Sequence, residues 1–190
     1  MVTFHHVAIA GSESPIGTAI AANLAARGVR VTPVDLTSIE ADTLTRQPDG
    51  PVDLLIVADG HTARRTSVAG IVRSDFEASL ARLTFAPFRL ANLIRPHLSP
   101  TARLVLLTRS DARMAVPDVN GAYLERPFRT AAHALWRCIT VEWRKDGITS
   151  AIVAIDHPAD ADRLINLLPQ LPTDGPGCQL HDIDGKVLDW

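Results

Sequence analysis

Residues 10–17 (AGSESPIG) constrain the fold of this chain more strongly than any other segment. They follow a short run rich in β-forming residues, HHVAIAG, and precede IGTAIAANLAARG, in which apolar residues recur at helical spacing as far as Gly28. This order brings backbone N–H groups to a helix amino terminus, where the helix dipole favours a pyrophosphate. The segment predicts a parallel α/β fold, and two interpretations of the loop stay open: a phosphate site or a plain strand-to-helix turn.

Strands and helices alternate along the rest of the chain. Five further segments are short apolar runs, which are typical of strands in a parallel sheet that helices cover on both faces. They are VRVTPVDL, DLLIVADG, RLVLLTRS, ITSAIVAID and CQLHDIDG. We predict one domain over residues 1–190, with an α/β, Rossmann-like, doubly wound parallel sheet of six strands. The connection at 37–51 has room for only a short helix and a turn, so one strand and helix unit is shortened.

Two long helical patterns cover residues 75–97 and 127–144. Pro87 predicts a kink in the first pattern. Pro127 is predicted to be the first helical residue of the second, because a proline at that position loses no hydrogen bond that the helix needs. Between Pro158 and the closing strand there is room for one short helix, so any lid over a substrate is short.

Composition narrows the choice of partners. The 190 residues include 19 basic and 21 acidic side chains, a formal charge of -2, so no overall field draws the chain to nucleic acid or to an anionic membrane. No apolar stretch approaches the roughly 20 residues of a membrane span. The two cysteines and seven histidines show no disulfide framework or metal-ligand spacing. We expect a cytoplasmic protein without a metal, whose partner is a small molecule.

The serine and tyrosine of the central region carry a family resemblance. Ser110 ends RLVLLTRS, and Tyr123 follows it by thirteen residues in AYLERP. Together with the AGSESPIG loop and VADG at 57–60, these segments resemble the short-chain dehydrogenase/reductase family over nearly the whole chain, at its TGxxxGIG, NNAG and YxxxK motifs. The resemblance implies Ser110 and Tyr123 as catalytic residues. It implies cofactor contacts at Gly11, Ser12, Ile16, Gly17, Asp35, Asp59 and Gly60.

The implied cofactor is NAD(P). Asp35 ends the second strand, where an acidic residue commonly binds the adenosine ribose and disfavours a 2′-phosphate, so NAD is favoured over NADP. A strand-end cap is the alternative for this aspartate. Pro15 replaces the middle glycine of the loop and removes an N–H donor, and Leu83 replaces the asparagine of the family's proton relay. A protein that binds no dinucleotide therefore stays an alternative.

The lysine of the YxxxK segment is missing. Pro127 stands four residues after Tyr123. Without a neighbouring cation, a tyrosine whose pKa is near 10 is a poor base at neutral pH. Arg126 points about 100° away on a helix, and the only lysines, Lys145 and Lys186, lie far along the chain. We therefore expect the family's usual reduction chemistry to be broken.

Charged residues surround Ser110 in the sequence. Arg109, Asp111 and Arg113 could line an anionic substrate site, or they could be solvated loop charges that contribute little. Ser110 and Tyr123 could still hydrogen-bond to a substrate oxygen together.

Three functions remain open. The first is an atypical small-molecule enzyme performing isomerisation, cyclisation or elimination with Ser110 and Tyr123 as hydrogen-bond donors or as acid and base. The second is an NAD(P)-dependent oxidoreductase, and the third is an inactive homologue that binds a ligand or a partner protein. By resemblance, a homodimer or homotetramer is expected through the helices at 75–97 and 127–144.

Overall fold

A parallel sheet of six strands forms the centre of the structure, a computed structural model that describes residues 4–35, 43–58, 65–117, 121–172 and 178–190. Its strands are β1 (His6–Ala10), β2 (Arg30–Val34), β3 (Val52–Val57), β4 (Leu98–Thr108), β5 (Thr149–Ala154) and β6 (Leu180–His181). Their order in the sheet is β2-β1-β3-β4-β5-β6, and every neighbouring pair is parallel. The predicted six-stranded, doubly wound sheet is confirmed.

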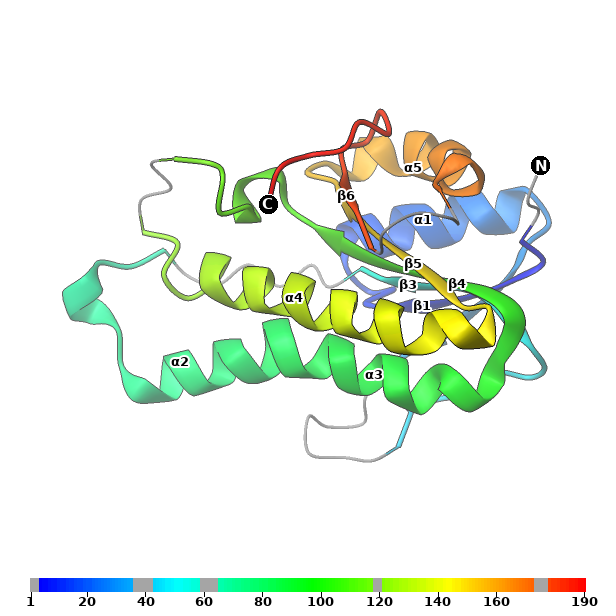
Figure 1. Ribbon diagram of the computed structural model, residues 1–190, viewed down its shortest axis with the longest axis horizontal. Coiled ribbons are helices and arrows are strands. Elements are labelled where there is room, and N and C mark those ends of the chain that lie inside the picture. Colours follow the sequence, from blue (N-terminus) through cyan, green and yellow to red (C-terminus); the bar gives the residue numbers. More distant parts are fainter. Residues whose placement is uncertain (1–3, 36–42, 59–64, 118–120, 173–177) are drawn as a thin grey trace.

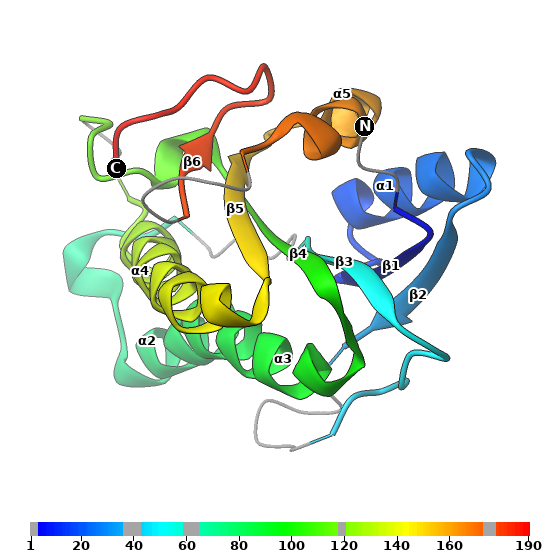
Figure 2. The same ribbon diagram turned by 45° about the vertical axis from the view of Figure 1, so that its right-hand side comes forward.

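Helices cover both faces of this sheet (Figures 1 and 2). Helices α1 (Pro15–Ala26) and α5 (Ala161–Leu167) lie on one face, and α2 (Arg73–Leu80), α3 (Ala86–Ile94) and α4 (Arg126–Trp143) lie on the other. Alternating strand residues face the two layers: Val7 and Ile9 pack with α1 and α5, while Ala8 and Ala10 pack with α3 and α4. Burial of both faces explains why the strands read as continuous apolar runs.

The predicted long helix at 75–97 is built from α2, a π-helical segment, α3 and a closing 3-10 turn at Arg95–His97. A π-helical segment, Ala81–Phe85, joins α2 to α3, and the backbone N–H of Ala86 donates to the carbonyl of Ala81. Pro87 follows directly and has no N–H for the carbonyl four residues before it. A wider turn accommodates this missing bond, so the proline's effect takes the form of a π-helical segment.

Helix α4 follows its prediction closely. It begins at Arg126, which makes Pro127 its second residue, and a 3-10 turn carries it to Gly147, whose φ of 83° ends the helix in the left-handed region. Trp136 and Trp143 are fully buried against the sheet. These tryptophans are core residues and do not form an outer surface.

The connections are as short as the sequence indicates. In the link between β2 and β3, the described residues 43–51 form bends and no helix. Between β5 and β6 the described residues contain α5 with a 3-10 turn on each side. None of the helices in the described ranges has both the length and the apolarity to cross a bilayer.

Candidate functional site

The loop after β1 is shaped by its two glycines. Gly11 has a φ of 72°, in the left-handed region that glycine adopts readily. Gly17 faces it so closely that a Cβ on Gly17 would lie 2.1 Å from the Gly11 carbonyl oxygen. At this crossing, any residue other than glycine at position 17 would force the backbone of the loop to move. The backbone geometry alone explains why positions 11 and 17 are glycines, without a bound phosphate.

Ser14 caps the amino terminus of α1 from within the chain. Its Oγ accepts a hydrogen bond from the Gly17 N–H at 3.0 Å and donates to the Gly11 carbonyl at 2.7 Å, with the Ala58 carbonyl as a second acceptor at 2.9 Å. Pro15, the first helical residue, has no N–H. Of the first three helical positions, only Ile16 keeps an N–H for a ligand. The loop therefore fits a dinucleotide pyrophosphate poorly.

Removing the Ser14 hydroxyl is expected to destabilise the fold. Ser14→Ala should lower the free energy of unfolding by about 1 kcal/mol, because the Gly17 N–H loses its capping acceptor. Ser12→Ala is the matched control, since the Ser12 hydroxyl has no hydrogen bond within the described residues. Urea unfolding of the two variants measures the difference. Equal losses would show that the cap contributes nothing specific.

The other predicted cofactor residues lie at the same edge of the sheet. Ala10 is paired with Val34 of β2 and with Val57 of β3, so the loops after all three strands meet there. Asp35 follows β2 and is exposed, and its backbone bonds to Thr45 at 3.0 and 2.8 Å. The remaining two predicted contacts, Asp59 and Gly60, lie outside the described residues. A cofactor role for any of these positions stays a prediction.

The predicted catalytic pair occupies two turns at the carboxyl end of β4 and the start of α4. Ser110 opens the 3-10 turn Ser110–Ala112, and its N–H donates to Asp156 Oδ1 at 3.1 Å. Tyr123 lies in the turn before α4 and is 40% exposed. In the described part of the chain, no hydrogen bond joins the two side chains. Their catalytic role remains a prediction.

Pro127 on α4 occupies the position of the missing lysine and supplies no cation. The neighbouring Arg126 donates to the backbone carbonyls of Arg113 at 2.8 Å and Met114 at 3.0 Å, and also to that of Val116. Its guanidinium is thus used to hold the loop that follows Ser110. Arg126 cannot replace the missing lysine.

Leu83 confirms that no polar relay passes through its position. Its side chain is buried in an apolar cluster with Leu124 and Phe128. An asparagine at this position would bury an amide among hydrocarbon groups, which is costly unless the amide is hydrogen-bonded. The hydrophobic cluster instead anchors the start of α4 to the π-helical segment.

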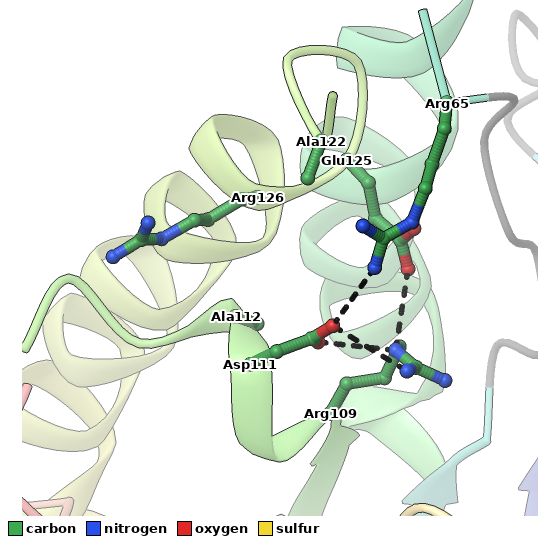
Figure 3. A pocket seen from close by; sticks show the side chains of 7 residues that line it. All are labelled: Arg65, Arg109, Asp111, Ala112, Ala122, Glu125 and Arg126. Atoms are coloured by element: carbon green, nitrogen blue, oxygen red, sulfur yellow. Dashed lines mark hydrogen bonds and ion pairs between the residues drawn. The ribbon is translucent and has the colours of Figure 1, made fainter. Parts of the chain in front are cut away.

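A polar pocket of about 220 Å³ lies beside this region (Figure 3). It is lined by Arg65, Arg109, Asp111, Ala112, Ala122, Glu125 and Arg126. In Figure 3, the side chains of Arg65, Arg109 and Glu125 converge with Asp111, while Arg126 points away from them. Ser110 and Tyr123 are not among the lining residues, although each is next in sequence to one of them.

Ion pairs organise the pocket. The Arg109 guanidinium binds Asp111 through two N–H groups at 3.1 and 3.4 Å, and its Nε lies 3.9 Å from Glu125 Oε1. Arg65 approaches Asp111 at 3.8 Å from the opposite side. Glu125 is held by the buried Arg129 at 3.0 Å. The hydrogen bonds that Arg109 donates to Asp111, with the charges of neighbouring carboxylates, raise the pKa of Arg109, so this arginine stays charged.

Part of this pocket was predicted from the sequence. Arg109 and Asp111, predicted to flank an anionic site, do line the pocket, but Arg113 turns away to the carbonyls of Ser110 and Asp189. Glu125 was missed, although its spacing of four residues from an arginine is a recognisable helical ion-pair signal. In the described ranges, no group of three or more His, Cys, Asp or Glu side chains could hold a metal ion.

Comparisons with known proteins support the fold. No family model and no curated protein matches the sequence. Among solved structures, the chain is similar to a short-chain dehydrogenase/reductase from Burkholderia multivorans with bound NADP (14% identity, TM-score 0.83, 99% of this chain and 100% of that one). It is also similar to NADPH-bound carbonyl reductase from chicken fatty liver, with 15% identity and a TM-score of 0.83 over 100% of both chains. A third similar structure is a carbonyl reductase from Pseudomonas aeruginosa PAO1 with NADP, with 17% identity and a TM-score of 0.77 over 98% of this chain and 100% of that one. At these identities the likeness shows that the chain has the short-chain dehydrogenase/reductase fold.

Proposed function

We propose that this chain is a small-molecule enzyme on the short-chain dehydrogenase/reductase fold that performs acid–base chemistry other than hydride transfer, such as isomerisation, cyclisation or elimination. The observation that carries the proposal concerns the two residues at the start of α4, Arg126 and Pro127, where the family places its lysine after the tyrosine. Position 127 is a proline, and Arg126 is engaged with three backbone carbonyls. Neither residue therefore offers a cation to Tyr123 from the start of α4.

The charged pocket offers a different proton acceptor. Asp111 and Glu125 line it, and a carboxylate within hydrogen-bond reach of a substrate can accept a proton as a general base. Arg109 and Arg129 hold the two carboxylates in place. In this scheme the hydroxyls of Ser110 and Tyr123 donate hydrogen bonds to a substrate oxygen, and Glu125 takes up the proton.

An NAD(P)-dependent oxidoreductase is the second candidate. Its support is the likeness in fold to structures that hold NADP or NADPH. The exposed Asp35 at the end of β2 would favour NAD over NADP in that case. The loop argues against this candidate, because Ser14 and Pro15 leave few N–H groups at the amino terminus of α1 for a pyrophosphate.

Titration with NADH and NADPH, followed by nicotinamide fluorescence, separates the two candidates. We expect no saturation of the wild-type protein at micromolar nucleotide. Pro15→Gly is the matched variant, because it restores one N–H at the start of α1 and should bind either nucleotide more tightly than the wild type. Micromolar binding by the wild type, with oxidation of the nucleotide when a carbonyl compound is added, would overturn the proposal in favour of the second candidate.

We also propose that the active species is a homodimer or homotetramer formed through the helical layer that contains α3 and α4. Val141 on α4 is 72% exposed and Phe85, just before α3, is 45% exposed, so both apolar side chains are accessible to a second copy of the chain. Val141→Glu should shift the protein to a smaller species in light scattering coupled to gel filtration. An unchanged mass for this variant, or a monomeric wild type, would contradict an interface at this face.

A further inference from the structure

We propose that the pocket around Arg109 binds the acidic group, a carboxylate or a phosphate, of the small molecule on which the protein acts. This inference rests on the proposed function, because it assigns the substrate class of the same site. It is carried by the balance of charge in the pocket, by the donors that Arg109 keeps and by the size of the cavity.

The pocket holds more positive than negative charge. Two guanidinium groups, on Arg65 and Arg109, and two carboxylates, on Asp111 and Glu125, meet in the pocket, whereas the guanidinium of Arg126 points away from them. Arg129, which holds Glu125 from behind, adds a further positive charge. A ligand with at least one negative charge would compensate this excess, whereas a cationic ligand would add to it. Since the formal charge of the whole chain is -2, the positive excess is a local property of this pocket.

Arg109 is the side chain that can receive the acidic group. Asp111 takes two of the five N–H donors of its guanidinium, through Nε and Nη2. The other terminal nitrogen, Nη1, has no hydrogen-bond partner among the residues that the structure describes. Asp111 also fixes the orientation of the guanidinium plane, so the remaining donors are held in place before a ligand arrives. An arginine positioned in this way binds carboxylates and phosphates with good geometry.

The cavity limits the size of the ligand. Its volume of about 220 Å³ lies below the roughly 300 Å³ at which sites for drug-sized ligands begin. Asp111 and Glu125 stand beside Arg109, so the acidic group of the ligand would be bound next to the two carboxylates that can accept a proton. This arrangement suits a small organic acid or phosphate ester whose reacting C–H or O–H group lies a few bonds from the anion.

The test uses three probes of similar size and the full chain without nucleotide. Benzoate, phenyl phosphate and benzyl alcohol are titrated by isothermal calorimetry. We expect saturable binding of at least one of the two anions at millimolar concentration and none of the neutral alcohol. Tighter binding of benzoate assigns a carboxylate and tighter binding of phenyl phosphate assigns a phosphate ester.

Arginine variants locate the binding. Arg109→Gln should weaken anion binding by about tenfold or more, and Arg109→Lys should fall between that variant and the wild type, because lysine keeps the charge but loses the planar donors. Arg163→Gln is the control, since Arg163 pairs with Asp160 and Asp184 away from the pocket. A thermal melt establishes that each variant is folded.

Three results would overturn the inference: no anion binding, equal binding of benzyl alcohol, or unchanged anion binding in both Arg109 variants. None of them depends on a nicotinamide nucleotide. Failure of the anion site can therefore be told apart from failure of the non-redox proposal.

Discussion

Gly17→Ala is expected to lower the free energy of unfolding by about 3 kcal/mol, a large part of the stability of a domain of this size. The alanine Cβ would lie 2.1 Å from the carbonyl oxygen of Gly11 and 2.9 Å from the Cα of Ser12. Both are backbone atoms, so no side chain can rotate to make room. The loop after β1 must move away from α1, and the Ser14 cap on the Gly17 N–H is strained with it.

Gly28→Ala is the matched control for this prediction. Gly28 ends the same helix with a φ of 76°, but no atom lies within 4 Å of the position that a Cβ would take there. Its substitution should cost only about 1 kcal/mol, the penalty of the left-handed backbone for alanine. Urea unfolding with a common m-value measures both variants. If the two glycines cost the same, the close crossing of Gly11 and Gly17 does not limit the fold.

The fold could be predicted from the sequence because its signals are local and repeated. Each buried strand is a short apolar run, and each helix begins or ends near a proline or glycine such as Pro15, Pro127 or Gly147. The two-face burial of a parallel sheet produces those runs directly. The resemblance of these segments to a known family adds the doubly wound arrangement, whereas the order of the strands comes from the structure.

The candidate site could be predicted only in part. Ser14 precedes a proline at a helix start, so its capping role was available from the sequence. The approach of Arg65 to Asp111 joins segments that are 46 residues apart, and no local pattern announces such a pair. Arg126 likewise shows in the sequence as a charged residue near Tyr123, whereas the structure shows it bound to backbone carbonyls. The contacts of Arg65 and Arg126 depend on partners far away in the sequence, and a single sequence does not show which residues those partners are.

Stability is expected to fall as the pH is lowered from about 6.5 to about 4, because His133 must stay neutral in the folded protein. His133 lies on α4, is 1% exposed, and hydrogen-bonds through Nε2 to the Thr108 hydroxyl at 2.8 Å. Burial, with a smaller contribution from the positive charge of Arg129, lowers its pKa to about 4. The ring of Trp190 packs edge-on against it, with centroids 5.8 Å apart.

The sign and size of this change in unfolding free energy follow from the difference in proton binding between the folded and unfolded states. In the unfolded chain the pKa of a histidine is about 6.5, so between that value and about 4 the unfolded state binds a proton that the folded state does not. The unfolded state is therefore favoured as the pH falls through this window, by about 3 kcal/mol in total. The full contribution of the neutral imidazole is present above pH 6.5 and is lost by about pH 4.

A histidine variant isolates this contribution from that of the carboxylates, which titrate at the lower end of the same window. His133→Gln keeps a polar group near Thr108 but cannot titrate, so its unfolding free energy should fall less steeply from pH 6.5 to 4.5 than that of the wild type. His157→Gln is the control, since His157 is exposed. Urea unfolding at half-unit pH steps gives the three curves. Parallel curves for the wild type and His133→Gln would mean that His133 takes up its proton as readily in the folded protein as in the unfolded chain.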